Sequence, residues 1–499
     1  MVREGDALRR IGQSAELFDD HSPLQLGAAG RYQGAAFTLV GRLQYRYAEG
    51  TWNEWHALFD SGAEQGKSAW LSEDNGRYVI AFDAPLRGAA PSAESLRAGA
   101  LLLVDGQRWT IASVTVAKLI AAEGELVDAP NLSRGFIVAD LRNTSGEVAT
   151  LDYSDAAQPR WSIGRSVALD ELTMTGLAEG VEKTLKARGV ECPSCGAALT
   201  VKLSTTQSIA CHQCHAVVDI SAGVGGELRH YAQEHGTEPQ IPLGTTGTLT
   251  LGGASAQPWQ VVGYVERCEV PDSADDEQVF WREYLLYHRT QGFAFLVDAD
   301  DGWSWTVPIT GVPETVGDAV KYRGVLYRKL YDYTGKVTYV LGEFYWKLER
   351  EQRTFNTDYR GTGQFAARQL NRERTGVSGE GGGEGEAQEV VWSAGEAIAS
   401  DAVLKAFRLA PEQSAALRRD VTPTSGNAAS LLAKLFFWGF LVVVLLMLFR
   451  CDSSGDNCDS LRNTYGDASA EYRNCLANQR SSRTSGGSYG GYSSGGGHK

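Results

Sequence analysis

The chain contains the same pattern twice, and this internal repeat constrains its fold more than any other feature. Glu125 and Asp140 recur as Glu343 and Asp358, in both cases 218 residues later. Two further matches have an offset of 231 residues, namely Trp161 with Trp392 and Gly164 with Gly395. The 13 additional residues fall on the Gly/Glu-rich stretch 376–388, whose composition favours a loop. A repeat of this length indicates two duplicated domains rather than the units of a solenoid.

Both copies have the pattern of antiparallel strands. Residues 36–47 alternate apolar and polar side chains over most of their length, which is typical of a half-buried strand. Asn143-Thr144-Ser145-Gly146 separates two such stretches and predicts a hairpin. We expect a first β domain at 23–178, closed by a short helix at 165–172, and a second β domain at 241–405.

The two copies differ in length, and the residues before the first copy show no recognisable pattern. The first copy carries 11 extra residues, which we place around 86–96. Residues 1–22 have no clear period and are expected to form a leader. No apolar run follows the charges at the N-terminus, so the sequence predicts no secretory signal.

Four cysteines between the copies are the most specific chemical signal. Cys192 and Cys195 form one Cys-x-x-Cys pair, and Cys211 and Cys214 form a second pair after 15 intervening residues. Zinc favours a tetrahedron of thiolates, and four protein ligands leave no position for a catalytic water. We therefore expect a structural zinc ribbon at 179–222, which fixes the arrangement of the two β domains.

The stretch 431–449 predicts a transmembrane helix. Its 19 residues include one charge, Lys434, and a helix of this length spans about 28 Å, close to the thickness of the hydrocarbon core. The alternative is a buried core helix, which such a long and uniformly apolar run disfavours. Residues 406–430 are then a juxtamembrane segment, and the Gly/Ser/Tyr-rich residues 450–499 form a disordered tail.

The charges beside this span predict its orientation. Arg418 and Arg419 precede it and acidic residues follow it, which favours the N-terminal body in the cytoplasm. Zinc thiolates also need a reducing compartment. We expect a tail-anchored protein of a bacterial inner membrane with a single span. If the tail lies outside, two of its three cysteines could pair; these are Cys451, Cys458 and Cys475.

A Trp-x-Glu-aromatic segment occurs once in each copy and is the candidate ligand surface. Its residues are Trp52, Glu54 and Trp55 in the first copy, and Trp281, Glu283 and Tyr284 in the second. A carboxylate beside aromatic rings suits a cationic ligand, which both charge and cation–π attraction would hold. The alternative is that the aromatic rings pack a core while each Glu lies on the solvated face of a strand.

Composition and motifs narrow the function. The net charge of −14 disfavours a phosphate backbone as the main partner, and the region of the four cysteines has no basic surplus once the thiolates are counted. The sequence contains no Gly-x-Ser-x-Gly, no Walker loop, no His-Glu-x-x-His and no dinucleotide-binding fingerprint. No catalytic residue is predicted, and a nucleic-acid binder is the weakest hypothesis.

Several motifs resemble the bacterial domain of unknown function 4178. The second copy carries them best, in Gly263-Tyr264, in Trp281-x-Glu283-Tyr284-x-Leu286-Tyr287 and in Gly292-Phe293-x-Phe295-Leu296-Val297. The first copy keeps Trp52-x-Glu54-Trp55 and resembles a diverged version. The resemblance implies a bacterial protein with no assigned reaction, and a link with a polyamine system at the membrane.

These observations predict a mainly β (α+β) protein with two related antiparallel β domains, a zinc ribbon between them and one C-terminal transmembrane helix. The expected function is a non-enzymatic, membrane-anchored binding or scaffold protein with a protein partner. The alternative is an enzyme, or a subunit of one, that acts on a small cationic metabolite such as a polyamine.

Overall fold

The computed structural model describes most of the chain in two compact units. The units are Met1–Val421 with Gly496–Lys499, and Thr422–Gly495. The described residues are 2–4, 7–9, 22–47, 51–60, 66–74, 77–127, 134–178, 190–203, 206–220, 228–233, 236–252, 255–271, 278–348, 351–375, 389–418 and 457–474.

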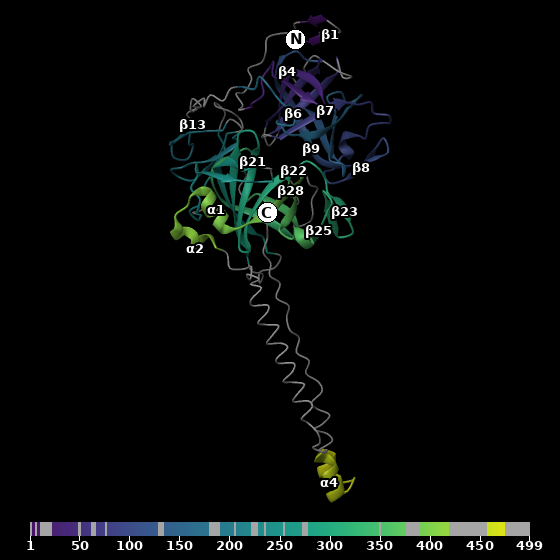
Figure 1. Ribbon diagram of the computed structural model, residues 1–499, viewed down its shortest axis with the longest axis vertical. Helices are drawn as coiled ribbons and strands as arrows, with labels where there is room; N and C mark the ends of the chain where they lie inside the picture. The colour runs from purple at the N-terminus through teal and green to yellow at the C-terminus, as the bar shows by residue number, and fades with distance from the viewer. Residues whose placement is uncertain are drawn as a thin grey trace. The chain divides into compact units, whose positions relative to one another are not determined.

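The first β domain is a closed antiparallel sheet (Figure 1, purple to blue). Its strands are β3 Ala29–Tyr32, β4 Ala35–Arg46, β5 Thr51–Phe59, β6 Ser68–Asp74, β7 Arg77–Asp83, β8 Leu101–Val104, β9 Gln107–Gly124, β10 Phe136–Arg142, β11 Glu147–Asp152 and β12 Arg160–Val167. The pairing runs from β4 through β5, β6 and β7 to β12, and then through β11 and β10 to β9. Strand β9 pairs with β4 again, so eight strands form a closed ring.

The second β domain repeats this order (Figure 1, teal to green). Its strands are β18 Thr246–Leu249, β19 Gln257–Glu269, β20 Phe280–His288, β21 Gly292–Ala299, β22 Gly302–Ile309, β23 Glu314–Val316, β24 Ala319–Tyr322, β25 Val325–Phe344, β26 Arg353–Gly361, β27 Arg368–Thr375 and β28 Glu389–Ile398. The ring runs β19, β20, β21, β22, β28, β27, β26 and β25, and β25 pairs with β19. The duplication predicted from the sequence is therefore confirmed at the level of strand order.

Two other parts of the chain contain short strands: the segment that connects the two domains in the sequence, and the N-terminal hairpin. Between the domains lie β13 Val190–Glu191, β14 Ala198–Leu199, β15 Ser208–Ala210, β16 Val217–Asp219 and β17 His230–Tyr231. Strands β1 Val2–Glu4 and β2 Ala7–Arg9 pair with each other at the start of the chain.

Apolar clusters cover the outer face of each closed sheet. In the first domain Trp55, Leu71 and Ile80 pack outward, and segments before β3 and after β12 cover them with residues such as Leu24 and Leu172. Successive residues of a strand point to opposite faces, so the residues between these face the interior of the ring. What fills that interior differs between the two copies.

The helices differ in part from the prediction. The helix expected at 165–172 is wrong: residues up to Val167 belong to β12 and pair with β7, and a turn follows. In the second domain α1 Ser400–Phe407 and α2 Ser414–Leu417 do form. Val403, Phe407 and Leu417 are buried in the core of that domain.

The second unit contains α4 Asn457–Tyr465. Among the described residues, no helix has both the length and the apolar composition that crossing a membrane requires. The predicted span at 431–449 and the predicted loop at 376–388 lie outside the described residues.

Candidate functional site

The Trp-x-Glu-aromatic segments lie on equivalent strands, β5 and β20, and the pleat divides their residues between two faces. Trp55 is buried in the outer cluster of the first domain. Tyr284 is likewise buried in the outer cluster of the second. These two aromatic residues therefore belong to the cores, as the alternative interpretation predicts. The Trp and Glu before them point into the interior of each ring.

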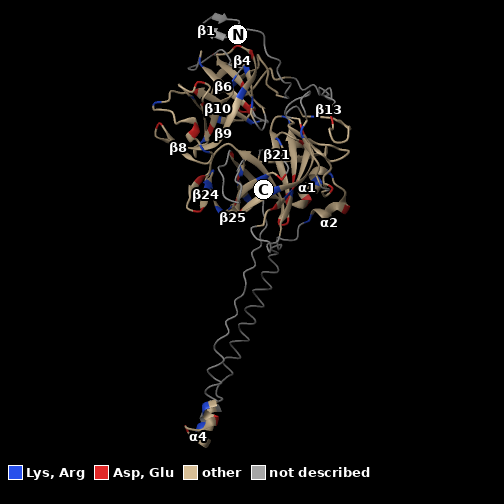
Figure 2. Cartoon of the chain, turned by 180° about the vertical axis from the view of Figure 1, so that it is seen from behind, with Lys and Arg blue, Asp and Glu red and all other residues tan. Residues whose placement is uncertain are grey.

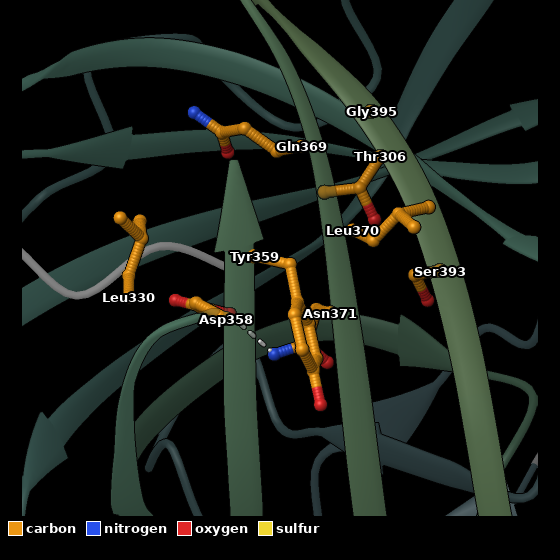
Figure 3. Close-up of a pocket in the computed structure, with 9 residues that line it drawn as sticks. All are labelled: Thr306, Leu330, Asp358, Tyr359, Gln369, Leu370, Asn371, Ser393 and Gly395. Carbon is orange, nitrogen blue, oxygen red and sulfur yellow. Dashed lines mark hydrogen bonds between the residues drawn. The ribbon is translucent and has the colours of Figure 1, made fainter. Parts of the chain in front are cut away.

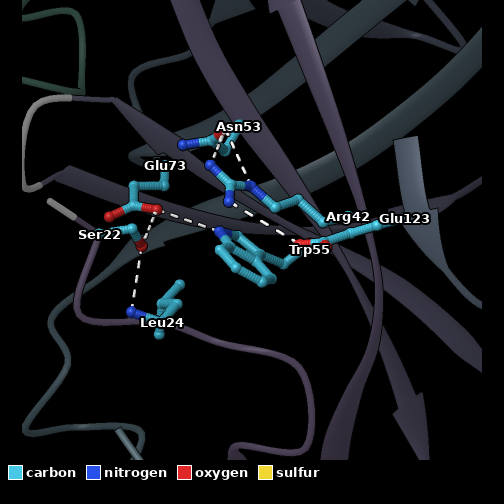
Figure 4. A network of polar contacts seen from close by, with 7 residues as sticks. All are labelled: Ser22, Leu24, Arg42, Asn53, Trp55, Glu73 and Glu123. Atoms are coloured by element: carbon cyan, nitrogen blue, oxygen red, sulfur yellow. Dashed lines mark hydrogen bonds and ion pairs between the residues drawn. The ribbon is translucent and has the colours of Figure 1, made fainter. Parts of the chain in front are cut away.

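A polar network supports the outer face in the first domain (Figure 4). The buried Glu73 carboxylate accepts hydrogen bonds from Trp55 Nε1 at 3.0 Å and from the Ser22 hydroxyl at 2.5 Å. The guanidinium of Arg42 lies 4.8 Å from the Trp55 ring centre and donates to Asn53 at 2.9 Å. This network anchors the segment before β3 and holds Trp55 in place.

The interior of the first domain contains a cavity of about 610 Å³. All eight strands of the ring contribute side chains to its wall. These are Leu43 and Tyr45 of β4, Glu54 of β5, Trp70 and Ser72 of β6, Val79, Ala81 and Asp83 of β7, Leu119 of β9, Phe136 and Ile137 of β10, Thr150 and Asp152 of β11, and Arg160 and Ser162 of β12. A closed sheet of eight strands is just wide enough to hold one small ligand.

Glu54 lines this cavity and forms no ion pair within 4 Å among the described residues, although the charge of Arg160 acts on it from a greater distance. Trp52 Nε1 donates to Glu54 Oε1 at 3.2 Å, and it is the one hydrogen-bond donor to this carboxylate among the described residues. The ring of Trp52 stacks on Tyr45, with 5.0 Å between the ring centres. Burial raises the pKa of Glu54 to about 7, the bond from Trp52 opposes this shift, and the nearby Asp152 adds to it.

The wall of the cavity is acidic. Five carboxylates line it, namely Glu54, Asp83, Glu94, Asp152 and Asp155. Two guanidinium groups, those of Arg134 and Arg160, also line it. Arg160 lies 2.8 Å from the Asp152 carboxylate, so one of the two cations is already paired. Aromatic rings of Tyr45, Trp70, Phe136 and Tyr153 complete the wall.

The segment that is extra in the first copy contributes to the same site. Ala93 and Glu94, in the short 3-10 helix η2 Ala93–Ser95, belong to the cavity wall. The Tyr153 hydroxyl donates to the Pro91 carbonyl at 2.8 Å and ties this segment to the ring. The insertion predicted around 86–96 therefore carries residues that the second copy does not have.

In the second domain both oxygens of the equivalent glutamate, Glu283, already have partners from the protein. Glu283 Oε1 accepts a hydrogen bond from Trp281 Nε1 at 2.8 Å, which repeats the bond between Trp52 and Glu54. Its other oxygen, Oε2, lies 3.1 Å from Nε of Arg267. Arg267 pairs with Trp281 across the strands, as Tyr45 pairs with Trp52, so Arg267 and Tyr45 occupy equivalent positions.

Large side chains fill the rest of this interior. Trp281 packs edge-on against Tyr333, with 5.7 Å between ring centres, and Val297 joins the same cluster. The position of Tyr333 is held by Thr115 in the first domain, because Tyr333 pairs with Asn356 where Thr115 pairs with Val138. Arg267 and Tyr333 of the second domain thus stand where the first domain has Tyr45 and Thr115.

A small cavity of about 10 Å³ lies in the second domain (Figure 3). Asp358 and Asn371 line it and are joined by a hydrogen bond of 2.7 Å. Such a volume has room for about one water molecule. Of these two cavities, the one in the first domain has room for a metabolite.

The four predicted cysteines meet at one point. Their sulfurs all lie within 4.8 Å of one another, and two pairs, Cys192 with Cys214 and Cys195 with Cys211, are 3.7 Å apart. A tetrahedron with metal–sulfur bonds of about 2.3 Å has sulfur–sulfur distances of about 3.8 Å, so the cluster could hold a zinc-sized ion. A backbone N–H of the Ala216 peptide lowers the pKa of Cys214 to about 7. A backbone N–H of Ala197 lowers the pKa of Cys195, but hydrogen bonds with the other sulfurs outweigh it and raise that pKa to about 12.

The two Cys-x-x-Cys turns have the same backbone. In the first, the Gly196 N–H donates to the Cys192 carbonyl, and in the second the His215 N–H donates to that of Cys211. Both Gly196 and His215 have a positive φ, of 74° and 59°. The Nδ1 of His215 lies 2.9 Å from the Tyr339 hydroxyl of β25, so this turn also contacts the second domain.

The cysteine segment is attached to the second domain. Strand β15 pairs with the end of β25 through Ile209 and Glu343. The buried Glu343 carboxylate accepts hydrogen bonds from the backbone N–H groups of Lys202 and Leu203 and from the Thr206 hydroxyl, at 2.8–3.0 Å. The cysteine segment is therefore joined to the second sheet through β15, as an extension of β25.

The sequence predicts Glu54 and Glu283 as candidate ligand-binding residues and misses the residues that surround them in the two interiors. The offset of 222 residues between Gly41 and Gly263 aligns Tyr45 with Arg267, and this is the signal that distinguishes the two copies. The acids contributed by other strands, such as Asp152, carry no local motif.

The fold and the site together define a duplicated closed β domain with one open interior and one filled interior. The model of the domain of unknown function 4178 matches residues 25–169 and 248–398, which together are more than half of the chain. The chain therefore belongs to this family, in two copies. No curated protein and no solved structure matches it.

Proposed function

We propose that the first β domain binds a small organic cation inside its closed sheet, as the ligand-binding part of a membrane-anchored protein. The observation that carries this proposal is the cavity of about 610 Å³ with Glu54 in its wall. Its volume lies within the range of about 300–1,000 Å³ that is usual for small-ligand sites. A linear polyamine is a ligand of this charge and size.

Charge and aromatic character favour a cation over other ligands. The wall carries more carboxylates than guanidinium groups, and ionisation of Glu54 makes it more negative still. The aromatic rings would attract the methylene chain and the charge of an organic cation. Acidic and basic residues are interspersed along the strands (Figure 2), and the chain as a whole is acidic, so nucleic acid is not the proposed partner.

The cysteine cluster supports a structural role for zinc. When bound, zinc would be held by Cys192, Cys195, Cys211 and Cys214 and would tie β13–β16 into one unit. The sulfur distances agree with a tetrahedral thiolate site, and Glu343 connects this unit to β25. The zinc ribbon and the second domain then form the scaffold of the protein. Elemental analysis should find one zinc per chain and none in a Cys192→Ser, Cys211→Ser double variant.

The cysteines also support a membrane-anchored chain with the body in the cytoplasm. The four sulfurs of the cluster are free thiols, whereas Cys458 in the second unit is disulfide-bonded. Thiols and disulfides are favoured in reducing and oxidising compartments respectively. A span at 431–449 would separate the two. Release of the full chain from bacterial membranes by carbonate without detergent would overturn this part of the proposal.

A thermal-shift titration with spermidine and 1,4-diaminobutane tests the binding function. We expect a dose-dependent rise in the unfolding temperature of the full chain in detergent, and its loss in Glu54→Gln. The matched control is Asp401→Asn, which removes one negative charge from α1 of the second domain, away from the cavity. A shift that persists in Glu54→Gln would overturn the site, and no shift with any organic cation would overturn the function.

An enzyme that acts on the same ligand is the second candidate. The observation in its favour is Glu54, because a carboxylate with a pKa of about 7 is suited to general acid–base catalysis near neutral pH. Incubation of the protein with the bound amine, followed by mass spectrometry, separates the two: an unchanged amine supports binding alone.

A further inference from the structure

The second domain shows which group fits beside the glutamate of this fold. Glu283 and Glu54 occupy equivalent positions, and each accepts a hydrogen bond from its tryptophan on one oxygen, Oε1. In the second domain the other oxygen is taken by the guanidinium of Arg267, at 3.1 Å. The ion pair is buried, with 6% and 2% of the two side chains exposed. The second domain therefore carries its own cation in its interior.

The first domain has the same carboxylate but not the cation. Tyr45 takes the place of Arg267, and its ring stacks on Trp52. It supplies no positive charge, and burial and the nearby Glu54 raise the pKa of its hydroxyl well above its usual value. Glu54 lines the cavity, and no described residue donates a hydrogen bond to its second oxygen. The substitution of Arg by Tyr therefore removes the internal cation from beside this glutamate.

We infer that the ligand of the first domain is an alkylguanidine whose guanidinium group binds Glu54 where Arg267 binds Glu283. This inference rests on the proposed function and specifies its ligand. A guanidinium is planar and offers several N–H donors in one plane, which matches a carboxylate oriented by Trp52. The aromatic rings of the wall can stack on such a plane as well.

The remaining acids indicate a second positive charge on the ligand. The cavity is far larger than one guanidinium group, and Asp83, Glu94 and Asp155 also line it. An aminoalkylguanidine would place its guanidinium at Glu54 and direct its ammonium group toward these acids. The extra segment of the first copy, which contributes Glu94, is then part of the recognition of the ligand.

A comparison of two monocations tests the head group directly. Isothermal titration of the full chain in detergent would compare butylguanidine with butylamine, which have equal charge and equal chain length. We expect butylguanidine to bind about tenfold tighter or more, because its planar head group can donate to Glu54 and stack on the aromatic rings of the wall at the same time, whereas an ammonium group cannot stack. 4-Aminobutylguanidine should bind tighter again than butylguanidine.

The variant Tyr45→Arg tests the equivalence of the two domains. It gives the first domain the Arg–Glu pair of the second, so we expect its affinity for 4-aminobutylguanidine to fall by about a hundredfold or more. The control Thr38→Arg adds the same charge on β4 outside the cavity, and its affinity should stay within about twofold. Circular dichroism would show whether both variants are folded. If Tyr45→Arg does not fold, the comparison of butylguanidine with butylamine on the unmodified chain still tests the inference.

The outcomes separate this inference from the proposed function. If butylamine binds as tightly as butylguanidine, the guanidine inference is wrong and the organic-cation site stands. If Tyr45→Arg binds with unchanged affinity, the equivalence with Arg267 is wrong. If neither guanidines nor amines bind at millimolar concentration, both proposals fail.

Discussion

The two β domains of this chain have the same strand order, but the interior of one is filled with side chains and the interior of the other is open. In the second domain a buried ion pair and two large aromatic rings fill the space inside the ring. In the first domain the same ring encloses a cavity of about 610 Å³. Since the backbone pairing is the same, the difference comes from side chains at a few equivalent positions and not from the fold.

The two copies also differ in the segments that pack against equivalent parts of their sheets. The end of β25 pairs with the cysteine segment, and Glu343 accepts its backbone N–H groups. The equivalent residue in the first copy, Glu125, uses its backbone carbonyl to accept a hydrogen bond of 2.8 Å from Nδ1 of His56 in β5. One copy thus has a packed interior and an extension that carries the four-cysteine cluster, while the other has an open interior and the segment with Glu94.

The largest expected difference comes from one substitution made at both glutamates. Glu283→Gln removes the charge that Arg267 needs in a buried site, and this should destabilise the second domain by about 3–5 kcal/mol. Glu54→Gln should not destabilise the first domain at neutral pH, because Glu54 has no such partner. Urea unfolding followed by tryptophan fluorescence would measure both. Equal losses in the two variants would contradict the contrast between the interiors.

The pH dependence of the first domain is the next largest effect. Folding raises the pKa of Glu54 from 4.5 to about 7, so the folded state keeps a proton that the unfolded state releases between these values. The contribution of Glu54 to stability is therefore fully present below pH 4.5 and is lost as the pH rises through about 7. The free energy of unfolding, relative to Glu54→Gln, should fall by about 2–3 kcal/mol between pH 4.5 and pH 8.

Other charged and titratable groups lie around Glu54, and the Glu54→Gln variant controls for their titration. Tyr45, Asp152, Arg160 and Asp140 face it or act on its charge from neighbouring strands. All of them remain in Glu54→Gln, so the difference between the two proteins isolates Glu54. Parallel curves for the two proteins across this range of pH would show that Glu54 titrates normally.

Most of the fold follows from local patterns that the sequence contains. The alternation in 36–47 predicts β4, and Asn143 to Gly146 form the hairpin turn, where the Asn143 side chain accepts the N–H groups of Ser145 and Glu147. The cysteine spacing predicts the cluster of four sulfurs. These features depend on residues close together in the chain, so a single sequence is sufficient to find them.

The rest depends on pairing between distant strands. The cavity exists because Thr115 and Tyr45 stand where the second domain has Tyr333 and Arg267, and these positions are equivalent only once the register of β4 with β5 and β9 is known. Bulges in β4 and in β19 shift that register by one residue. The predicted helix at 165–172 fails for the same reason, because β7 offers its residues a strand partner.

The attachment of the cysteine segment gives a smaller effect that is confined to the second domain. Glu343→Ala removes the acceptor of two backbone N–H groups and of the Thr206 hydroxyl, which should cost about 2–3 kcal/mol. The matched substitution Glu125→Ala in the first domain should cost less than about 1 kcal/mol. Limited proteolysis should cut Glu343→Ala near residues 202–206 at unchanged zinc content. If the unfolding of both variants is alike, the segment is not an extension of β25.

The smallest expected effects compare the two Cys-x-x-Cys turns, which share a backbone but differ in one residue. Gly196 has a φ of 74° and open space around its α-carbon, so Gly196→Ala meets no neighbour and should cost about 1 kcal/mol from the left-handed backbone alone. His215 already bears that cost at a φ of 59°, and its ring contacts Tyr339 of β25 at 2.9 Å. His215→Gly relieves the backbone but loses this contact, so the net change should be within about 0.5 kcal/mol. Thermal unfolding of the zinc-loaded variants would measure both changes. A loss in His215→Gly larger than in Gly196→Ala would mean that the contact with Tyr339 outweighs the strain, and that the second turn is kept for its attachment to the second domain rather than for the metal.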